Sequence, residues 1–300
     1  LVNSKINEKD FITEQKQCTE DNGKFAHAME RIFCIIVDEA GYKIYTNDFE
    51  KQKFLYKFKI FMQNIFSIKR HKNNKVIYTC ISGSYDNLQH QTYIDNEWDY
   101  ICFTDNKALL KRKKLYCWSI QPMQYKKLDS TKNARWHKMH PHILFPDYEY
   151  SLWIDANVDI KTPYLFNLIK NSKSLILVPI HFKSKCVYEE ADYILYCKKE
   201  SKKNVDKAVN FLIKHNMPAN YGQNETNIIY RKHNNTEIKK VMKTWFKCIE
   251  KISKRDQLFF SYALWKNGIK VEDIIIPNSR FDKTNYSVAK HPKHIRITPF

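Results

Sequence analysis

A short apolar run that ends in acidic and amide side chains is the clearest candidate for chemistry in this sequence. The run over 150–154 reads Y-S-L-W-I, which is typical of a buried strand, and Asp155 and Asn157 follow it. Carboxylate and amide oxygens at this spacing can both reach one hard cation such as Mg²⁺ or Mn²⁺, which would hold phosphate oxygens of a substrate. Asp159 is either a third ligand or a turn residue. Strand-terminal Asp and Asn are also common in turns, so D-A-N alone is a weak signal.

Polar side chains follow two other predicted strands. The segment T-C-I-S-G-S-Y-D, from Thr79 to Asp86, places small residues such as Ser82 and one glycine after the first strand. A base or a phosphate could approach such a backbone closely. Tyr85 could stack on a uracil ring or lie on the surface. Asp105 could accept a hydrogen bond from a pyrimidine N–H or close an ordinary turn. Ligands of parallel sheets bind at the carboxyl ends of strands, so we expect Ser82, Asp105 and Asp155 on one rim.

Basic and histidine side chains are candidates for the phosphate and metal contacts. Arg135 and Lys138 lie three apart on a predicted helix, a spacing that suits a diphosphate. The alternative is a solvated face, as in many Lys-rich chains. In the tail H-P-K-H, His291 or His294 could complete a metal shell, although such residues are usually exposed to solvent. Lys293 is a further candidate phosphate contact.

Two acidic residues are candidates for binding or deprotonating an acceptor hydroxyl. Asp256, in R-D-Q, is either a helix N-cap or a general base. His181, Glu189 and Glu190 follow another predicted strand. Glu189 could bind the acceptor hydroxyl or simply begin a helix, where the dipole favours acids.

The bulk composition narrows the class of protein. The 300 residues suit one large domain or two small ones, and the hydrophobic content of 43% can form a core. The net charge of +19 implies an anionic partner, which could be nucleic acid, anionic lipid or a phosphorylated substrate. The 8 cysteines form no C-x-x-C pair, which is typical of reduced thiols in a cytosolic protein. The chain begins with Leu1, as expected of a piece of a longer protein.

The order of predicted elements favours an α/β fold. We expect an N-terminal extension over 1–74 and one domain over 75–300. In that domain strands are predicted over 76–81, 100–103, 115–120, 150–154, 174–179, 226–231 and 271–276. Helices are predicted over 130–140, 164–170, 189–199, 204–215, 237–252 and 257–265, with Ser130 as an N-cap and a stop or kink at Pro141. Alternating strands and helices predict an α/β sandwich with a mainly parallel sheet.

The extension contains a predicted basic amphipathic helix over 51–70. Its apolar residues recur at helical spacing, and lysines are interleaved with them. Such a helix can pack against the body of the protein or lie on an anionic membrane surface. We predict no transmembrane span, because no apolar run reaches about 18 residues.

Several blocks in one order resemble a single family. They are V-I-Y-T-C-I-S-G-S-Y-D, D-Y-I-C-F-T-D-N, N-A-R-W-H-K-M-H-P-H-I-L-F-P, Y-S-L-W-I-D-A-N-V-D-I, C-V-Y-E-E-A, R-D-Q-L-F-F-S-Y-A-L-W and H-P-K-H. Together they resemble the glycosyltransferase-like domain family of plant TOD/MUCI-type proteins and bacterial capsule or lipopolysaccharide cluster enzymes. The resemblance covers about Lys75 to His294.

This resemblance implies a GT-A fold, which is a Rossmann-like sandwich with a D-x-D-type metal site. It implies Mn²⁺ or Mg²⁺ at Asp155 and Asn157, with Arg135 and Lys138 near the donor. It also implies that Asp256 lies near the acceptor and that a tail histidine binds metal or diphosphate. Asn in place of the second Asp departs from the motif and would weaken the affinity for the metal.

We therefore expect a metal-dependent glycosyltransferase with a nucleotide-sugar donor, most simply UDP-linked, and a surface glycan or lipid-linked acceptor. If the reaction inverts the sugar carbon, Asp256 is the candidate base; if it retains the configuration, the leaving phosphate can take the proton. We expect a cytoplasmic protein, peripheral on the inner face of the membrane. The alternatives are a nucleotide-sugar hydrolase and an inactive nucleic-acid-binding module, although nucleic-acid-binding signatures are absent.

Overall fold

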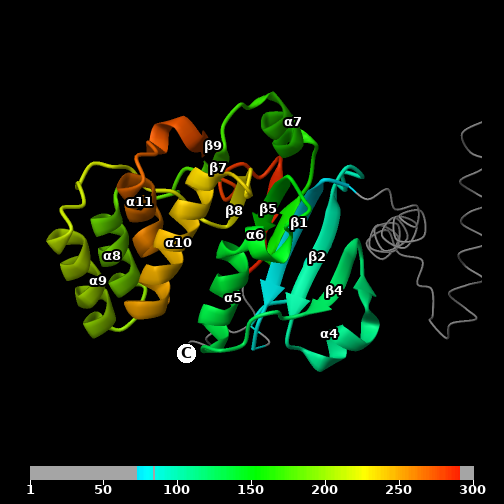
Figure 1. Ribbon diagram of the computed structural model, residues 1–300, viewed down its shortest axis with the longest axis horizontal. Helices are drawn as coiled ribbons and strands as arrows, with labels where there is room; N and C mark the ends of the chain where they lie inside the picture. The colour runs from blue at the N-terminus through cyan, green and yellow to red at the C-terminus, as the bar shows by residue number, and fades with distance from the viewer. Residues whose placement is uncertain (1–72, 84, 291–300) are drawn as a thin grey trace, which may run out of the picture. The chain divides into compact units, whose positions relative to one another are not determined.

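The described part of the chain is built around one large sheet with helices on both faces. The computed structural model describes residues 73–83 and 85–290 (Figure 1). Its eight-stranded sheet has the order β3-β4-β2-β1-β5-β8-β7-β9, and β6 pairs with β10 in a separate two-stranded sheet. Strands β4, β2, β1 and β5 are parallel neighbours, whereas β8 runs antiparallel to β5 and β7. The predicted mainly parallel α/β sandwich is confirmed.

The strands have the following bounds: β1 (Lys75–Ile81), β2 (Asp99–Thr104), β3 (Lys114–Leu115), β4 (Trp118–Pro122), β5 (Tyr150–Ile154), β6 (Val158–Ile160), β7 (Ile176–Pro179), β8 (Ile228–Arg231), β9 (Ile275–Ile276) and β10 (Tyr286–Val288). The helices are α4 (Lys107–Arg112), α5 (Ser130–Met139), α6 (Pro141–Leu144), α7 (Tyr164–Asn171), α8 (Val187–Tyr196), α9 (Lys202–Lys214), α10 (Thr236–Lys251), α11 (Gln257–Lys266) and the 3₁₀ turn η1 (Val271–Ile274).

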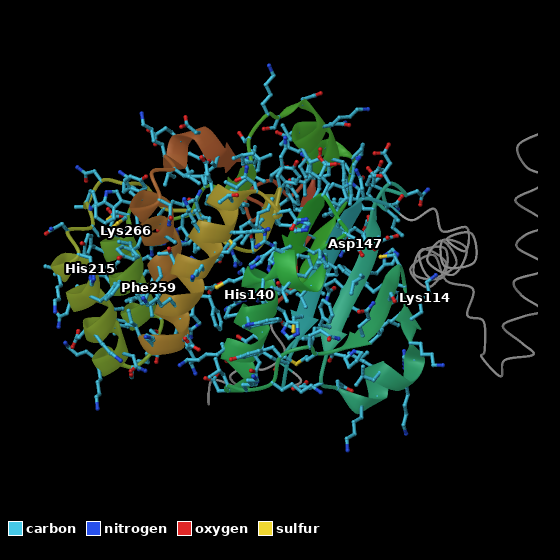
Figure 2. All side chains as sticks on the ribbon, viewed as in Figure 1. Lys114, His140, Asp147, His215, Phe259 and Lys266 are labelled. Atoms are coloured by element: carbon cyan, nitrogen blue, oxygen red, sulfur yellow. The ribbon has the colours of Figure 1, made fainter. Side chains whose placement is uncertain are left out.

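The central strands are buried on both faces of the sheet. Successive side chains of a strand point to opposite faces, so each strand contributes to a core on either side. In β1, Val76 and Tyr78 pack into the core that also contains residues of α5, α8, α9, α10 and α11. Ile77 and Ile81 pack into a second core on the other face, together with residues of α7. Side chains fill the space between the sheet and the helices (Figure 2).

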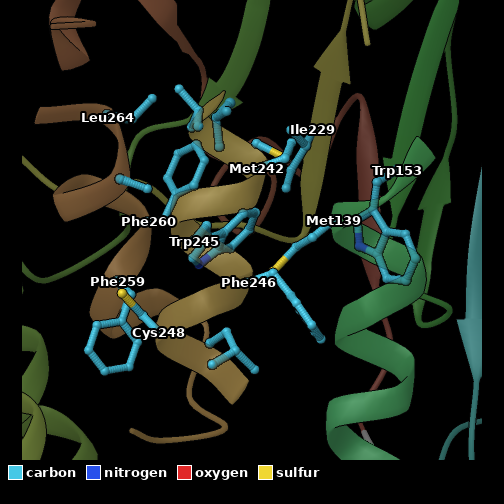
Figure 3. Packing of buried hydrophobic residues seen from close by; sticks show 14 of the residues in the cluster. Met139, Trp153, Ile229, Met242, Trp245, Phe246, Cys248, Phe259, Phe260 and Leu264 are labelled. Atoms are coloured by element: carbon cyan, nitrogen blue, oxygen red, sulfur yellow. The ribbon is translucent and has the colours of Figure 1, made fainter. Parts of the chain in front are cut away.

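Trp245 of α10 lies at the centre of the first core. Its ring centroid is 4.6 Å from that of Phe260 of α11 (Figure 3). Its indole Nε1 donates a hydrogen bond to the backbone carbonyl of Asp256 at 2.8 Å. This buried tryptophan therefore fixes the start of α11, where Asp256 lies, against α10.

Side-chain caps begin several of the helices. Asn235 accepts hydrogen bonds from two backbone amides at the start of α10, and Ser201 accepts one at the start of α9. Asp129, and not Ser130 as predicted, caps α5, since its carboxylate accepts from the Lys132 amide at 3.0 Å. The predicted stop at Pro141 is confirmed, because α5 ends at Met139 and α6 begins at Pro141.

Two predicted strands were wrong in part. The strand predicted over 115–120 is a reversal from β3 to β4, and Tyr116 there has a φ of 56° that breaks the extended run. The strand predicted over 271–276 begins as the 3₁₀ turn η1, in which Val271 and Ile274 are both buried. That spacing of three residues is the 3₁₀ period and not the strand period.

The predicted N-terminal helix over 51–70 lies outside the described residues, and the domain boundary predicted at residue 74 stays a prediction. In the part of the chain that the structure describes, none of the helices combines the length and the apolar character that crossing a membrane requires.

Candidate active site

A cleft of about 390 Å³ opens at the rim where β1 and β5 end and β8 begins. One side of it consists of the loop after β1 and the first turns of α5. The opposite side consists of the segment after β7, α8 and the start of α11. Asp155, directly after β5, is among its lining residues. Ligand sites of α/β sheets lie at this rim, so the cleft is the candidate site.

Asp155 is held in place by its neighbours on the rim. Its backbone amide donates to the carbonyl of Asn227 at 2.8 Å, and its Oδ1 accepts from the indole Nε1 of Trp153 at 2.7 Å. Lys138 Nζ lies 3.6 Å from the same Oδ1. The side chain remains 30% exposed, so its carboxylate is accessible from the cleft.

Asn157 and Asp159 are used by the structure in other ways. Asn157 is 5% exposed, does not line the cleft, and donates from Nδ2 to the carbonyl of Ala289 at 2.8 Å. Asp159, in β6, accepts from the amide and the hydroxyl of Thr92 at 2.6 and 2.8 Å. Asp159 therefore anchors the segment that contains Thr92 and is neither a turn residue nor a residue of the cleft.

Lys138, Arg135 and Asp256 form a charged group at the cleft, in which Arg135 and Asp256 belong to the lining and Lys138 lies behind them. Asp256 Oδ2 lies 2.7 Å from Lys138 Nζ, and its Oδ1 lies 3.1 Å from an Arg135 guanidinium nitrogen. Thr226 also donates to Oδ2, at 3.1 Å. The Lys138 side chain is only 1% exposed and sits between the rings of Trp153 and Trp245, with its Nζ 5.5 and 5.8 Å from their centroids.

The two cations decide the charge of Asp256. Burial alone would raise the pKa of this carboxyl, but Arg135 and Lys138 outweigh burial and hold its pKa well below the ordinary value. Asp256 is the predicted N-cap of α11 by position, yet its side chain caps nothing there. Both oxygens are engaged with cations, and such a low basicity is unsuited to the general base that the sequence suggested.

The loop after β1 has its shape fixed by Asp105. The Asp105 carboxylate accepts from the Gly83 amide at 3.0 and 3.1 Å and from the Ser82 hydroxyl at 3.4 Å. Gly83 has a φ of 61°, and a Cβ there would lie 3.3 Å from the Cβ of Ser130. Glycine therefore lets the loop approach α5.

The predicted donor-binding residues divide into two groups. Ser82, Tyr85 and Arg135 line the cleft, and Tyr85 is 40% exposed. Asp105, Lys138 and Thr79 are absent from its lining. Thr79 is fully buried, and its hydroxyl has no hydrogen-bond partner among the residues that the structure describes. A bound donor could therefore contact Ser82, Tyr85 and Arg135 directly. Asp105 and Lys138 would act on the donor only through the cleft residues that they contact.

Glu190, and not Glu189, faces the cleft. Glu189 is exposed and its carboxylate accepts from the amide of Lys185 at 2.7 Å. Glu190 accepts from the Ser184 hydroxyl at 2.8 Å and from Gln257 Nε2 at 3.3 Å. Burial raises the pKa of Glu190. The helical period of the sequence would have identified Glu190 as an inward-facing residue, because it lies on the same face of α8 as the buried Val187, Ala191 and Ile194.

His181 lies beside Glu190 in a neutral form. Its Nδ1 accepts from the amide of Ser184 at 2.8 Å, which leaves the ring hydrogen on Nε2, 3.2 Å from Glu190 Oε2. Burial, together with the nearby charges of Arg280 and Lys199, lowers the pKa of His181 to about 4. The sequence named this histidine, but the contact with Glu190 depends on a reversal of the chain after β7.

Further cleft residues were missed from the sequence, among them a set of cations: Lys199, Lys254, Arg255 and Arg280. Arg280 pairs with the buried Glu225, which also accepts from Asn278 Nδ2 at 2.9 Å. Lys and Arg are frequent throughout this chain, so no local signal distinguished these four. His291, Lys293 and His294 lie outside the described residues, and their roles stay predictions.

The oxygen donors near the cleft fit a hard cation in part. Within 73–83 and 85–290, no three His, Cys, Asp or Glu side chains are grouped so as to hold a metal ion. However, Mg²⁺ keeps several waters and binds one or two protein carboxylates together with substrate phosphates. Asp155 supplies such a carboxylate. In Asn157 the amide nitrogen is engaged, so the oxygen is the atom left for a cation.

The family is shown by the sequence of the chain. Residues 57–291 match the family described as TOD1/MUCI70, glycosyltransferase-like domain. The chain belongs to this family. No curated protein matches it. As a member of the TOD1/MUCI70 family the chain is a glycosyltransferase-like protein, as the sequence blocks predicted.

Two solved structures are among those found to be similar to this TOD1/MUCI70 domain. Mouse xyloside xylosyltransferase 1, in its apo form, shares 11% identity, with a TM-score of 0.39 over 69% of this chain and 85% of that one. The bifunctional glycosyltransferase WbbM, also apo, shares 10% identity, with a TM-score of 0.38 over 71% of this chain and 39% of that one. Both are glycosyltransferases by name.

Proposed function

We propose that this protein is a metal-dependent glycosyltransferase that moves a sugar from a UDP-linked donor to a glycan or lipid-linked acceptor. The observation that supports this most is the position of Asp155 in the cleft, which Arg135 also lines, with Lys138 Nζ 3.6 Å from the Asp155 carboxylate. A carboxylate and fixed cations on one rim suit a diphosphate and its counter-ion.

The donor's diphosphate would be held mainly by Arg135. This side chain lines the cleft, and its contact with Asp256 occupies only part of a guanidinium group that has five N–H donors. Asp256 keeps the guanidinium oriented. Lys138 is too deeply buried to touch a ligand, so its role is to keep Asp256 ionised through its charge.

The base of the nucleotide would lie over the loop after β1. Tyr85 offers an exposed ring beside the cleft, and Ser82 and Gly83 offer a close approach to the backbone. The preference for UDP over other nucleotides is part of the proposal and rests on the small residues Ser82 and Gly83 and on the exposed Tyr85 ring.

Asp155 and the Asn157 amide oxygen would hold Mn²⁺ or Mg²⁺, with His291 or His294 as a further ligand. When bound, such an ion neutralises the charge that develops on the departing diphosphate. Ala289, whose amide donates to the Asn157 carbonyl at 2.9 Å, brings the described chain to within two residues of His291. This proximity in sequence supports the tail histidines as candidates.

The proposed location is cytoplasmic, at the inner face of a membrane. The net charge of +19 is attracted to anionic lipid headgroups, which would bring a lipid-linked acceptor close to the protein.

Thermal unfolding with nucleotides tests the proposal. We expect UDP with Mn²⁺ to raise Tm, and we expect GDP, CMP or UDP without metal to raise it less, because a ligand that binds the folded state stabilises it by mass action. An unchanged Tm with every nucleotide, in the presence or absence of Mn²⁺, would overturn the proposed donor class.

A further inference from the structure

Aromatic rings form one wall of the cleft and continue past it. Phe182 follows β7, Tyr193 and Tyr196 lie on α8, and Phe281 lies between β9 and β10. Phe182 and Tyr193 line the cleft. The Phe182 ring centroid lies 5.8 Å from that of Tyr193 and 6.4 Å from that of Phe281. We call these four residues the aromatic wall.

The outer rings of the aromatic wall are open to solvent. Tyr196 is 82% exposed and Phe281 is 70% exposed. A single exposed apolar residue needs no explanation, but a group of exposed rings continuous with a cleft is typical of a binding surface. Neither residue contributes to the two cores described above.

Ammonium groups accompany the rings. Lys183 Nζ lies 4.5 Å from the Tyr193 centroid and 5.9 Å from that of Tyr196, and Lys199 Nζ lies 4.9 Å from Tyr193. In the described part of the chain, neither lysine is paired with a carboxylate. Arg280 lies 5.4 Å over Phe182 but already pairs with Glu225. The wall is thus both aromatic and positively charged.

The aromatic wall is separate from the elements that carry the donor candidates. Asp155 follows β5 and Arg135 lies on α5, whereas the wall is built on α8 and on the segments after β7 and β9. Glu190 precedes Tyr193 by one turn of α8, so the wall begins beside this buried carboxylate at the cleft. A ligand on the wall would extend outward from the point where Glu190 lies.

We propose that the aromatic wall binds the acceptor, and that this acceptor is a chain of pyranose sugars that carry carboxylates, as uronic acids do. The inference rests on the proposed glycosyltransferase function. The C–H faces of pyranose rings stack on aromatic rings, which are apolar on their faces. Lysines are point charges. Lys183 and Lys199 both lie against the Tyr193 ring, and Lys183 is also near Tyr196, so a sugar chain stacked on these rings would bring its carboxylates close to single ammonium groups. A clustered phosphate would instead favour converging arginines.

Two hexasaccharides that differ only in charge test the proposal. We expect calorimetry to show that the β-1,4-mannuronate hexamer binds about tenfold more tightly than β-1,4-mannohexaose. A hexaglutamate peptide supplies the charge without the sugar faces, and we expect it to bind no more tightly than mannohexaose. Equal binding of hexaglutamate and the mannuronate hexamer would reduce the wall to a basic surface and overturn the proposal, as would an absence of binding by both saccharides.

Variants of exposed residues assign the binding to the wall. We expect Phe281→Ala and Tyr196→Ala each to weaken mannuronate binding by about fivefold or more. We expect Lys183→Glu to abolish the preference for the charged hexamer. Ile213→Ala is the matched control, because Ile213 is 59% exposed on α9, away from the wall. Full mannuronate binding by Phe281→Ala and Tyr196→Ala would contradict the assignment.

Two further readouts separate this inference from its alternatives. The thermal shift with UDP and Mn²⁺ should stay unchanged in the wall variants, and its absence from the parent protein would count against the donor proposal and not against the wall. Sedimentation of the parent and Phe281→Ala proteins measures self-association. If the parent is a dimer and the variant a monomer, the rings cover a second copy of the chain, and the acceptor proposal is wrong.

Discussion

The ammonium of Lys138 lies 2.7 Å from the carboxylate of Asp256, and both side chains are almost completely shielded from solvent. The two residues are 118 positions apart in sequence. Their contact joins α5 to the start of α11 at the cleft, which Asp256 lines. This pair, with Arg135 on the other oxygen of Asp256, gives the rim a fixed arrangement of charge before any ligand binds.

Asp256→Asn should destabilise the protein strongly. The variant keeps the shape of the side chain but leaves Lys138 and Arg135 without their buried counter-charge, which typically costs about 3–5 kcal/mol. Urea denaturation measures the change in the free energy of unfolding. Asp206→Asn is the control, since Asp206 pairs with Lys202 at 2.7 Å on the exposed face of α9 and should matter by less than about 0.5 kcal/mol.

The same variant should change the dependence of stability on pH. The folded-state pKa of Asp256 is below its ordinary value, so its stabilising effect is complete above about pH 4 and is lost as pH falls toward the folded-state pKa. Asp256→Asn should therefore lose less of its remaining stability between pH 4 and acid unfolding than the parent does. If the unfolding free energy falls equally steeply below pH 4 in both proteins, the assignment of a negative charge to Asp256 is contradicted.

Tyr78→Phe should destabilise the core, whereas Tyr286→Phe should not. The Tyr78 hydroxyl accepts from the buried Arg231 guanidinium at 2.5 Å and donates to the Lys138 carbonyl at 2.9 Å. Its removal leaves a buried charged donor unpaired, at a cost of about 1–3 kcal/mol. The buried Tyr286 hydroxyl has no hydrogen-bond partner among the described residues. Unfolding free energies that fall equally in both variants would show that Arg231 does not depend on Tyr78.

Glu190→Gln should reduce turnover, and Glu189→Gln should leave it nearly unchanged. Glu190 lines the cleft, and burial raises its pKa toward the range of a useful base, while Glu189 is exposed and bonded to the Lys185 amide. Release of UDP from a panel of UDP-sugars measures turnover. We expect a loss of about tenfold or more for Glu190→Gln. The opposite ranking of the two variants would restore the original prediction for Glu189.

The elements of the rim could be predicted because each depends on local sequence. The apolar run before Asp155 and the small residues after β1 are short-range patterns, and the structure has both at strand ends. Arg135 was also placed correctly on α5, since helical spacing needs no tertiary information.

The partners of these residues could not be predicted, because they come from distant parts of the chain. From the sequence, Lys138 was expected to bind a diphosphate together with Arg135. The structure shows instead that Lys138 is buried and paired with the distant Asp256. Asn157 looked like an equal partner of Asp155, but its Nδ2 is engaged by Ala289, 132 residues away. Glu190 differs from these residues, because its position on the inward face of α8 could have been predicted from the helical period alone.

The most direct test of the account is calorimetric titration of UDP in the presence of Mn²⁺ into Asp155→Ala. The parent should bind UDP in a metal-dependent manner, and Asp155→Ala should lose about tenfold or more in affinity, since Asp155 offers the accessible carboxylate of the rim. Asp159→Asn, which can keep hydrogen bonds to Thr92, should bind UDP as the parent does. Equal, metal-dependent UDP affinity in the parent and Asp155→Ala would contradict the proposed site.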